Sequence, residues 1–318
     1  MKIVLSVSIA VWLAGALDAA AQLRLPHPLH AEGYSLAANA ADPVKPATEP
    51  VGTERDVPAP TPQQLWLRSA GLIVGGSLLI AAYGLNKWWN EGFTGDFRTE
   101  DENWFSQGTK YGGADKVGHA WFSYFSARIF SQGFEAAGNE RGAAQRLGFW
   151  TALGIMVGVE VVDGFSRQYR FSKEDAVMNL AGAGLGYWIE RSPDLDRLAD
   201  FRLLYRKSEG NDWDPPGDYS GQTYLLVAKA NGLPGLRQHG VLRYFELAMG
   251  YGTRGYESTP GAEGQRNLYY GVSLNLSEAL AQTVFRGARE RSRTQRATDM
   301  FLEFVQVPGT AALAKHQL

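Results

Sequence analysis

Four apolar segments of helical length, all within residues 64–201, limit the possible folds of this chain more strongly than any other pattern in its sequence. The first runs from Leu65 to Asn86 and has no charged residue between Arg68 and Lys87. Its eighteen uncharged residues are at the lower limit for crossing a bilayer, and tryptophans near both ends resemble an interfacial belt. This segment therefore fits either a membrane-spanning helix or a buried core helix.

The other three segments carry helix start and stop signals. The second is expected from Asp115, after a Gly-Gly pair, to about Ala137, and the third from Arg141 to Asp163. The fourth should begin after an N-cap at Ser172 and end before Pro193. The uncharged stretches of the last two segments are about thirteen and fourteen residues long, which is short for crossing a bilayer alone. We therefore expect a four-helix apolar module that can form a bundle core.

Polar residues are placed along these apolar helices at helical spacing. With about 100° per residue, Asp115 and His119 share a stripe, and Asp175 and Asn179 share another. Desolvating such groups costs several kcal/mol unless they pair, bind a cation or line water. We therefore expect them to meet inside the fold as one polar cluster. Its expected members are Asp115, Lys116, His119, Glu160, Asp163, Arg170, Ser172, Asp175 and Asn179.

Two interpretations of the polar cluster remain open. In the first, a divalent cation is held by one imidazole and several carboxylate oxygens, a ligand set that favours manganese or magnesium over zinc. Its ligands would be Asp115, His119, Glu160, Asp163 and Asp175. In the second, no cofactor is bound: Lys116, Arg167 and Arg170 neutralise the acids, and Asn179 joins helices through its amide.

The ordered spacing of these residues resembles a known family. The strings are Asp115-Lys116-x-x-His119, Glu160-x-x-Asp163 and Arg170-x-Ser172-x-x-Asp175-x-x-x-Asn179-x-x-Gly182-x-x-x-Gly186. They resemble the YfiM-like family of uncharacterised periplasmic lipoproteins over residues 113–190 and are more loosely similar to VanZ-like membrane proteins. The resemblance implies an envelope location and brings no established reaction, although VanZ-like members are linked to glycopeptide resistance.

The chain departs from both patterns. It has no cysteine, so the N-terminal lipidation of a lipoprotein is not expected. Asp163 stands where VanZ-like proteins tend to carry Gln, which adds a charge and favours a cation site. Gly182-x-Gly184-x-Gly186 follows no strand, so we interpret it as a helix-packing face and not as a nucleotide-binding loop.

The N-terminal residues predict export followed by a spacer. Lys2 precedes the apolar run Ile3–Leu17, and the Ala19-Ala20-Ala21 triplet predicts signal-peptide cleavage before Gln22. Residues 22–62 contain eight of the fourteen prolines and one aromatic residue, which predicts a disordered tether.

The last third of the chain changes to short aromatic runs with a period of two. Strands are expected at Gln222–Ala230, Leu242–Tyr251 and Leu268–Leu276, and another at Phe301–Val307. So few strands cannot close a membrane-spanning barrel, which needs about eight, so a small antiparallel sheet packed on the helices is preferred. A final amphipathic helix should follow Ser277 and Glu278, and order should end at Pro308-Gly309. The basic residues of that helix are Arg286, Arg289, Arg291, Arg293 and Arg296.

The composition narrows the function classes. The charges nearly cancel, 31 Lys+Arg against 33 Asp+Glu, so no global field attracts nucleic acid. The absence of cysteine excludes thiolate zinc sites, disulfides and cysteine nucleophiles. The sequence contains no Gly-rich phosphate loop and no G-x-S-x-G elbow. No reaction follows from these patterns, and enzyme activity stays an open question.

Together these patterns predict an α+β envelope protein in four parts. They are a signal peptide (1–21), a tether (22–62), a helical membrane-associated module (63–201), and an antiparallel sheet with an amphipathic helix (202–318). The leading function is non-enzymatic, with the polar cluster fixing helix packing and with membrane lipid or an envelope protein as partner. The alternative is a metal-assisted hydrolase acting on a lipid or a cell-wall precursor. The sequence selects no oligomeric state.

We predict that the mature chain begins at Gln22. Intact-mass analysis of envelope fractions should give the mass of a chain starting at this residue. A mass that retains residues 1–21 would contradict signal-peptide cleavage.

Overall fold

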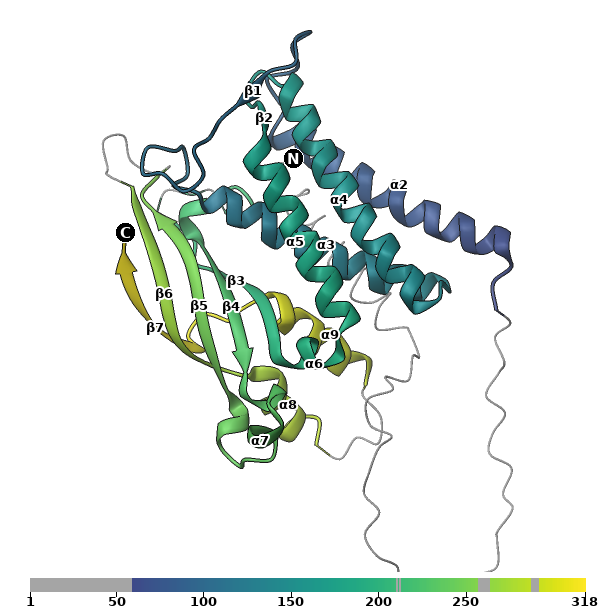
Figure 1. The fold of residues 1–318 in the computed structure, drawn as a ribbon, viewed down its shortest axis with the longest axis vertical. Helices are drawn as coiled ribbons and strands as arrows, with labels where there is room; N and C mark the ends of the chain where they lie inside the picture. Colours follow the sequence, from purple (N-terminus) through teal and green to yellow (C-terminus); the bar gives the residue numbers. More distant parts are fainter. Residues whose placement is uncertain (1–58, 210, 212, 257–263, 287–291) are drawn as a thin grey trace, which may run out of the picture.

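Helix α3 (Ala114–Ala137) lies between a helical bundle and a five-stranded sheet, and it contacts both (Figure 1). In this computed structural model the described residues are 59–209, 211, 213–256, 264–286 and 292–318. The expected α+β class is confirmed. The signal peptide, most of the tether, Arg289 and Arg291 lie outside the described residues.

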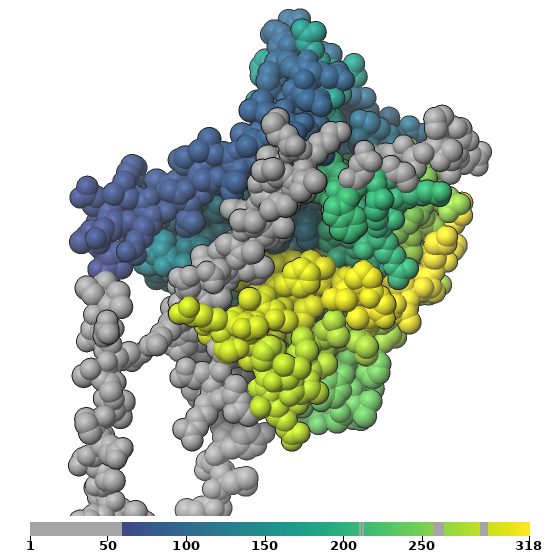
Figure 2. Space-filling model, turned by 180° about the vertical axis from the view of Figure 1, so that it is seen from behind, coloured from purple at the N-terminus to yellow at the C-terminus, as the bar shows by residue number. Residues whose placement is uncertain are grey.

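The bundle consists of α2 (Pro62–Lys87), α3, α4 (Arg141–Phe165) and α5 (Lys173–Arg191), which confirms the four-helix module. Helices α3, α4 and α5 pack against one another. Helix α2 touches α3 and α4 and runs along the outer edge of the molecule (Figures 1 and 2). A two-stranded parallel pair, β1 (Thr99–Glu100) and β2 (Phe171–Ser172), joins the loop before α3 to the start of α5.

The helix ends follow from local chemistry. Ser172 is the N-cap of α5, as predicted, because its Oγ accepts the backbone N–H of Asp175 at 3.2 Å. Gly113 and Gly138, with φ of 84° and 108°, flank α3 in the left-handed region that favours glycine. Helix α2 begins earlier than expected, inside the segment assigned to the tether, because Thr61 and Gln64 form a capping box around Pro62.

Glycines bring α5 against α3. A Cβ atom on Gly182 would overlap the carbonyl oxygen of Ala120, and one on Gly186 would lie 2.8 Å from the carbonyl oxygen of Tyr124. The two glycines are one turn apart on α5, so they form one packing face, as the sequence predicted. Gly184 is not part of this packing face, because a Cβ atom there would meet no atom within 4 Å.

The large sheet is an antiparallel meander in the order β3-β4-β5-β6-β7. Its strands are β3 (Ala199–Tyr205), β4 (Gln222–Lys229), β5 (Phe245–Arg254), β6 (Gln265–Leu274) and β7 (Ala311–Gln317). Strands β4, β5 and β6 confirm the three main expected strands. Helix α6 (Pro193–Leu198) leads into β3, and α7 (Pro234–Arg237) lies between β4 and β5. Single 3₁₀ turns occupy Tyr219–Gly221, Ala230–Gly232 and Leu242–Tyr244.

Several C-terminal expectations were wrong. The boundary at residue 201 falls inside β3, and β7 continues the sheet beyond Pro308-Gly309. Both strands exist through pairing with a neighbour, which overrides weak local propensity. In place of one arginine-rich helix there are α8 (Leu276–Gln282) and α9 (Arg293–Phe304). Helix α9 includes much of the expected strand Phe301–Val307. Ser292 caps the start of this helix, and its Leu302 and Phe304 side chains are buried, so the helix is stabilised at both ends.

The sheet is polar inside and apolar outside along β5. Glu246 is 1% exposed and accepts from Arg202 at 2.7 Å, whereas Leu247 and Met249 are 68% and 62% exposed. One face of β5 is therefore buried, and it is the polar one. On β6 the exposed apolar side chains continue with Leu268, Tyr270, Val272 and Leu274.

Aromatic packing joins the bundle to the sheet. Tyr124 and Phe125 of α3 form one buried core with Phe201 of β3, Tyr224 of β4 and Phe304 of α9. The ring centroids of Phe125 and Phe304 lie 4.9 Å apart, edge to face. The two faces of α3 therefore differ: aromatic residues contact the sheet, and its polar stripe faces α4 and α5.

We predict that Gly182→Ala lowers the free energy of unfolding by roughly 1–3 kcal/mol, because the new methyl group overpacks the contact with Ala120. Gly184→Ala is the matched control. It should stabilise the protein by up to about 1 kcal/mol, since it raises helix propensity in open space. Urea unfolding measures both changes, and equal effects would contradict the proposed close contact.

Candidate functional site

Three helices and one loop bring most of the expected polar cluster to a single place. Helix α3 supplies Asp115, Lys116 and His119, α4 supplies Glu160, and α5 supplies Asp175, Asn179 and its N-cap Ser172. Burial is deep: Lys116 and Glu160 are each 1% exposed, and Asn179 is fully buried. The arrangement depends on the glycine contact between α3 and α5, which lies within one or two turns of His119 and Asn179.

One trio of ligand atoms combines an imidazole with two carboxylates. His119 Nδ1 lies 3.4 Å from Glu160 Oε1, and His119 Nε2 lies 3.9 Å from Asp175 Oδ2. One ligand atom from each of the three residues lies within 4.8 Å of the other two. A nitrogen and two oxygens at this spacing can hold a divalent cation.

A second trio, Glu102, Asp115 and Asp175, has the same spacing but already contains a cation. The Lys116 ammonium contacts Glu102, lies 2.9 Å from Asp115 Oδ2 and lies 3.2 Å from Asp175 Oδ1. The lysine ammonium therefore already provides a positive charge among the three carboxylates of this trio. The trio of His119, Glu160 and Asp175 is the better candidate for a metal ion.

Asn179 orients the imidazole from α5. Its Oδ1 accepts from Ser123 Oγ at 2.9 Å and lies 3.3 Å from His119 Nδ1. In the tautomer with the proton on Nδ1, that nitrogen donates to Asn179 and Nε2 keeps a free lone pair facing Asp175. This is the usual way in which a metal-binding histidine is held.

The carboxylates at the site are short of compensating charge. Burial raises the pKa of Glu160 to about 9, and the nearby Asp175 and Asp163 carboxylates contribute to that rise. Burial likewise raises the pKa of Asp115 to about 7. Glu160 Oε1, Asp175 Oδ1 and Asp115 Oδ1 are buried and make no hydrogen bond within the described chain. The Lys116 ammonium lies 3.2 Å from Asp175 Oδ1, and His119 Nδ1 lies 3.4 Å from Glu160 Oε1, so one lysine and one imidazole face several buried acids. A proton or a bound cation would lower the cost of burying them.

Asp163 lies beside the two trios and belongs to neither. Its Oδ1 accepts the indole N–H of Trp89 at 2.6 Å, and desolvation raises the pKa of its carboxyl to about 7. Asp163 therefore links α4 to the end of α2, and its role as a metal ligand stays a prediction.

Arg170 and Arg167 do not pair with the buried acids, contrary to the expectation from the sequence. Both follow the end of α4, where the chain turns outward. Arg170 pairs with Glu100 at 3.2 Å on the surface, and Arg167 donates to the Phe93 carbonyl at 3.3 Å. Neither guanidinium neutralises the buried acids.

Two carboxylates of the site were missed from the sequence. Glu102 lies in the loop before α3, where no helical periodicity applies, and it accepts from Ser172 Oγ at 3.1 Å. Glu174 is fully buried, although its place in the first turn of α5 suggested only a favourable interaction with the helix dipole. The acidic pair Asp101-Glu102 was the only available signal for the loop residue.

Comparison with known families supports the resemblance seen in the sequence motifs. A family model described as predicted periplasmic lipoprotein (DUF2279) matches residues 101–191. The match includes both trios and confirms the YfiM-like resemblance, while nothing supports the VanZ-like one. It agrees with the expected exported, periplasmic or envelope-associated location. No curated protein and no solved structure matches the chain.

We predict that Glu160 makes the cation-free protein less stable as pH rises. The raised pKa means that the folded state binds more protons than the unfolded state between pH 4.5 and about 9. The free energy of unfolding should therefore fall across this window, by at most about 1.4 kcal/mol per pH unit from this group. Glu160→Gln removes that contribution.

Urea unfolding at pH 5.5 and 8.5 with a chelator measures the effect. The stability of Glu160→Gln relative to the unmodified protein should be higher at pH 8.5 than at pH 5.5. The exposed Glu91→Gln control should show no such change. A pH-independent difference for Glu160→Gln would contradict the raised pKa.

Proposed function

We propose that this is a membrane-associated envelope protein whose helical module binds one divalent cation at His119, Glu160 and Asp175. One observation carries the proposal: the trio joins three ligand atoms within 4.8 Å, and its buried Glu160 Oε1 makes no hydrogen bond in the described chain. Lys116 contacts Asp175 Oδ1 but no lysine or arginine pairs with Glu160 among the described residues. A buried carboxylate oxygen without such a partner, next to an imidazole and a second carboxylate, supports a cation site.

The main role proposed for the cation is to fix helix packing. Its three ligands come from α3, α4 and α5, so one ion would link all three helices. The hydrogen bond from Ser123 to Asn179 already links two of these helices independently. The cation would relieve repulsion that otherwise opposes their association. This is a non-enzymatic function that builds on the predicted polar cluster.

Exposed apolar residues support association with a membrane. Trp66 and Leu78 of α2, Trp150 of α4 and Trp188 of α5 are all between 64% and 68% exposed. Helices α2 and α4 are long and apolar enough to cross a membrane by length and composition, and only 11% of the apolar window of α2 is buried. The outer face of β5 and β6 is a second exposed apolar surface, on the other side of α3 from α2 (Figure 1). Patches of this kind typically mark contact with lipid or with another protein.

Metal-assisted hydrolysis is the second candidate function. Three protein ligands leave a coordination position for water, as in catalytic metal sites. The His119 side chain is 18% exposed, so the site reaches solvent. A lipid or a cell-wall precursor remains the substrate class to test.

We predict that Mn²⁺ binds the purified full chain with one-to-one stoichiometry. A cation at 100 times its dissociation constant should stabilise the fold by about 2.7 kcal/mol. His119→Ala, Glu160→Gln and Asp175→Asn should each abolish binding. Arg170→Ala should not, because Arg170 pairs with Glu100 on the surface.

Isothermal titration calorimetry and thermal unfolding measure these effects, with Mg²⁺ and Zn²⁺ tested in parallel. Failure of all three ions to bind would reject the cation site. Binding that survives all three ligand substitutions would place the ion elsewhere. If Mn²⁺-loaded protein also hydrolysed a lipid or cell-wall precursor, and Asp175→Asn stayed folded but lost that turnover, the second candidate function would replace the first.

A further inference from the structure

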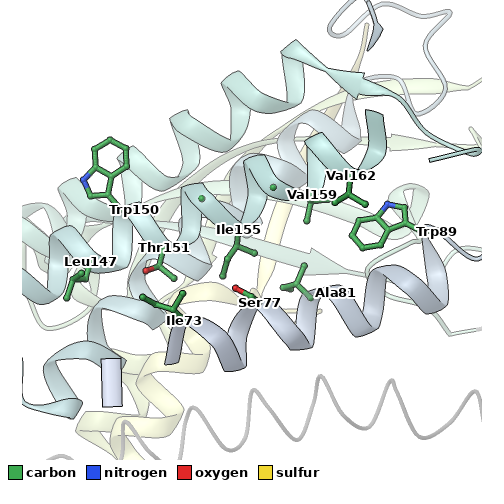
Figure 3. Close-up of a pocket in the computed structure, with 13 residues that line it drawn as sticks. Ile73, Ser77, Ala81, Trp89, Leu147, Trp150, Thr151, Ile155, Val159 and Val162 are labelled. Atoms are coloured by element: carbon green, nitrogen blue, oxygen red, sulfur yellow. The ribbon is translucent and has the colours of Figure 1, made fainter. Parts of the chain in front are cut away.

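An open apolar groove of about 570 Å³ runs between α2 and α4 (Figure 3). Ile73 and Ile80 of α2 and Leu147, Ile155 and Val159 of α4 supply its walls. Its volume lies within the range of small-molecule sites. The groove is separate from the cation trio, because it lies on the side of α4 that faces α2.

Small residues keep the groove unfilled. Ser77 and Ala81 line it from α2, and Gly154 and Gly158 line it from α4. A Cβ atom on either glycine would meet no atom within 4 Å. Protein interiors are normally packed without such gaps, and water gains few partners from an apolar lining. The space therefore suits an apolar ligand.

The shape of the groove fits a single hydrocarbon chain. From Leu147 to Val162 it follows α4 over fifteen residue steps, or about 22 Å at 1.5 Å per step. One leaflet of a bilayer core is about 15 Å deep, half of the usual 30 Å. An extended acyl chain can therefore lie within the groove along its length. The groove is open at the side, next to the exposed apolar surface of α2.

An arginine lies on the turn beyond one end of the groove. Trp89 closes this end (Figure 3). The Trp89 indole N–H donates to Asp163 at 2.6 Å. Arg167 packs on the turn that follows, where its backbone N–H binds the Gly92 carbonyl and its Nε binds the Phe93 carbonyl. Arg167 is exposed, and its side chain binds a backbone carbonyl and no carboxylate in the described part of the chain. The Arg167 guanidinium could therefore pair with an anionic group bound near Trp89.

We propose that the groove binds one acyl chain of an anionic glycerophospholipid, with the lipid phosphate at Arg167. The apolar walls recognise the chain, and the guanidinium recognises the phosphate. A phospholipid fits better than an apolar peptide because it supplies a negative charge at one end of a straight chain. The proposal goes beyond cation binding and does not depend on it.

Photolabelling tests this proposal with the full chain mixed with phosphatidylethanolamine vesicles. The vesicles contain phosphatidylglycerol that carries a diazirine in one acyl chain. Mass spectrometry should locate adducts on residues 73–81 and 147–162. Gly158→Leu or Gly154→Leu fills the groove and should reduce these adducts about tenfold, a loss of about 1.4 kcal/mol in affinity. Gly184→Leu, on α5 and equally free of close contacts, should label normally.

A matched pair of arginine substitutions tests the proposed phosphate contact. Arg167→Gln should reduce groove labelling severalfold, whereas Arg170→Gln should not, because Arg170 is already paired with Glu100. A diazirine-labelled free fatty acid is the comparison probe and should label the groove less than the phospholipid does. Thermal unfolding and Mn²⁺ titration of the same variants show that the fold and the cation site are intact.

Three outcomes would overturn the proposal. Unchanged labelling in both groove-filling variants would place the lipid on the outer helix surfaces. Labelling by the free fatty acid alone would reject a phospholipid. Absence of groove adducts in protein that binds Mn²⁺ normally would reject the groove as a lipid site while leaving the cation site standing.

Discussion

Desolvation of the carboxylates on α3, α4 and α5 governs how the helical module is built. Glycines at 182 and 186 let α5 approach α3 closely, and this approach buries Asp175 and Asn179 against His119. Lys116 pairs with Asp115 and Asp175, whereas Glu160 has no lysine or arginine partner among the described residues. The same contact that stabilises the bundle therefore creates a site that favours a cation or protons.

Beside its aromatic core, the protein buries several charged groups and exposes several large apolar ones. Arg202 and Glu246 form a buried pair, whereas Leu247 of the sheet and Trp150 and Trp188 of the bundle are exposed. The proposed contact with lipid would account for the exposed apolar residues, because it provides apolar surroundings outside the fold. The cation site and the groove are then two separate features of one helical module, on different sides of α4.

The helices and most of the site could be predicted because both depend on helical periodicity. Asp115 and His119 are four residues apart, as are Asp175 and Asn179, so each pair had to share a face. Glu102 could not be assigned to the site from the sequence, because a loop has no regular periodicity from which the direction of a side chain can be predicted. Strand β7 and helix α9 were not predicted, because both depend on tertiary contacts. Strand β7 pairs with β6, and α9 buries Phe304 in the aromatic core.

Anomalous diffraction from crystals grown with Mn²⁺ would decide whether the trio binds a cation. We expect one strong peak at the manganese absorption edge, within coordination distance of His119, Glu160 and Asp175, and no comparable peak where Lys116 contacts Glu102. A structure without manganese at the trio, in which the Glu160 and Asp175 oxygens bind only protein groups or water, would contradict the cation site.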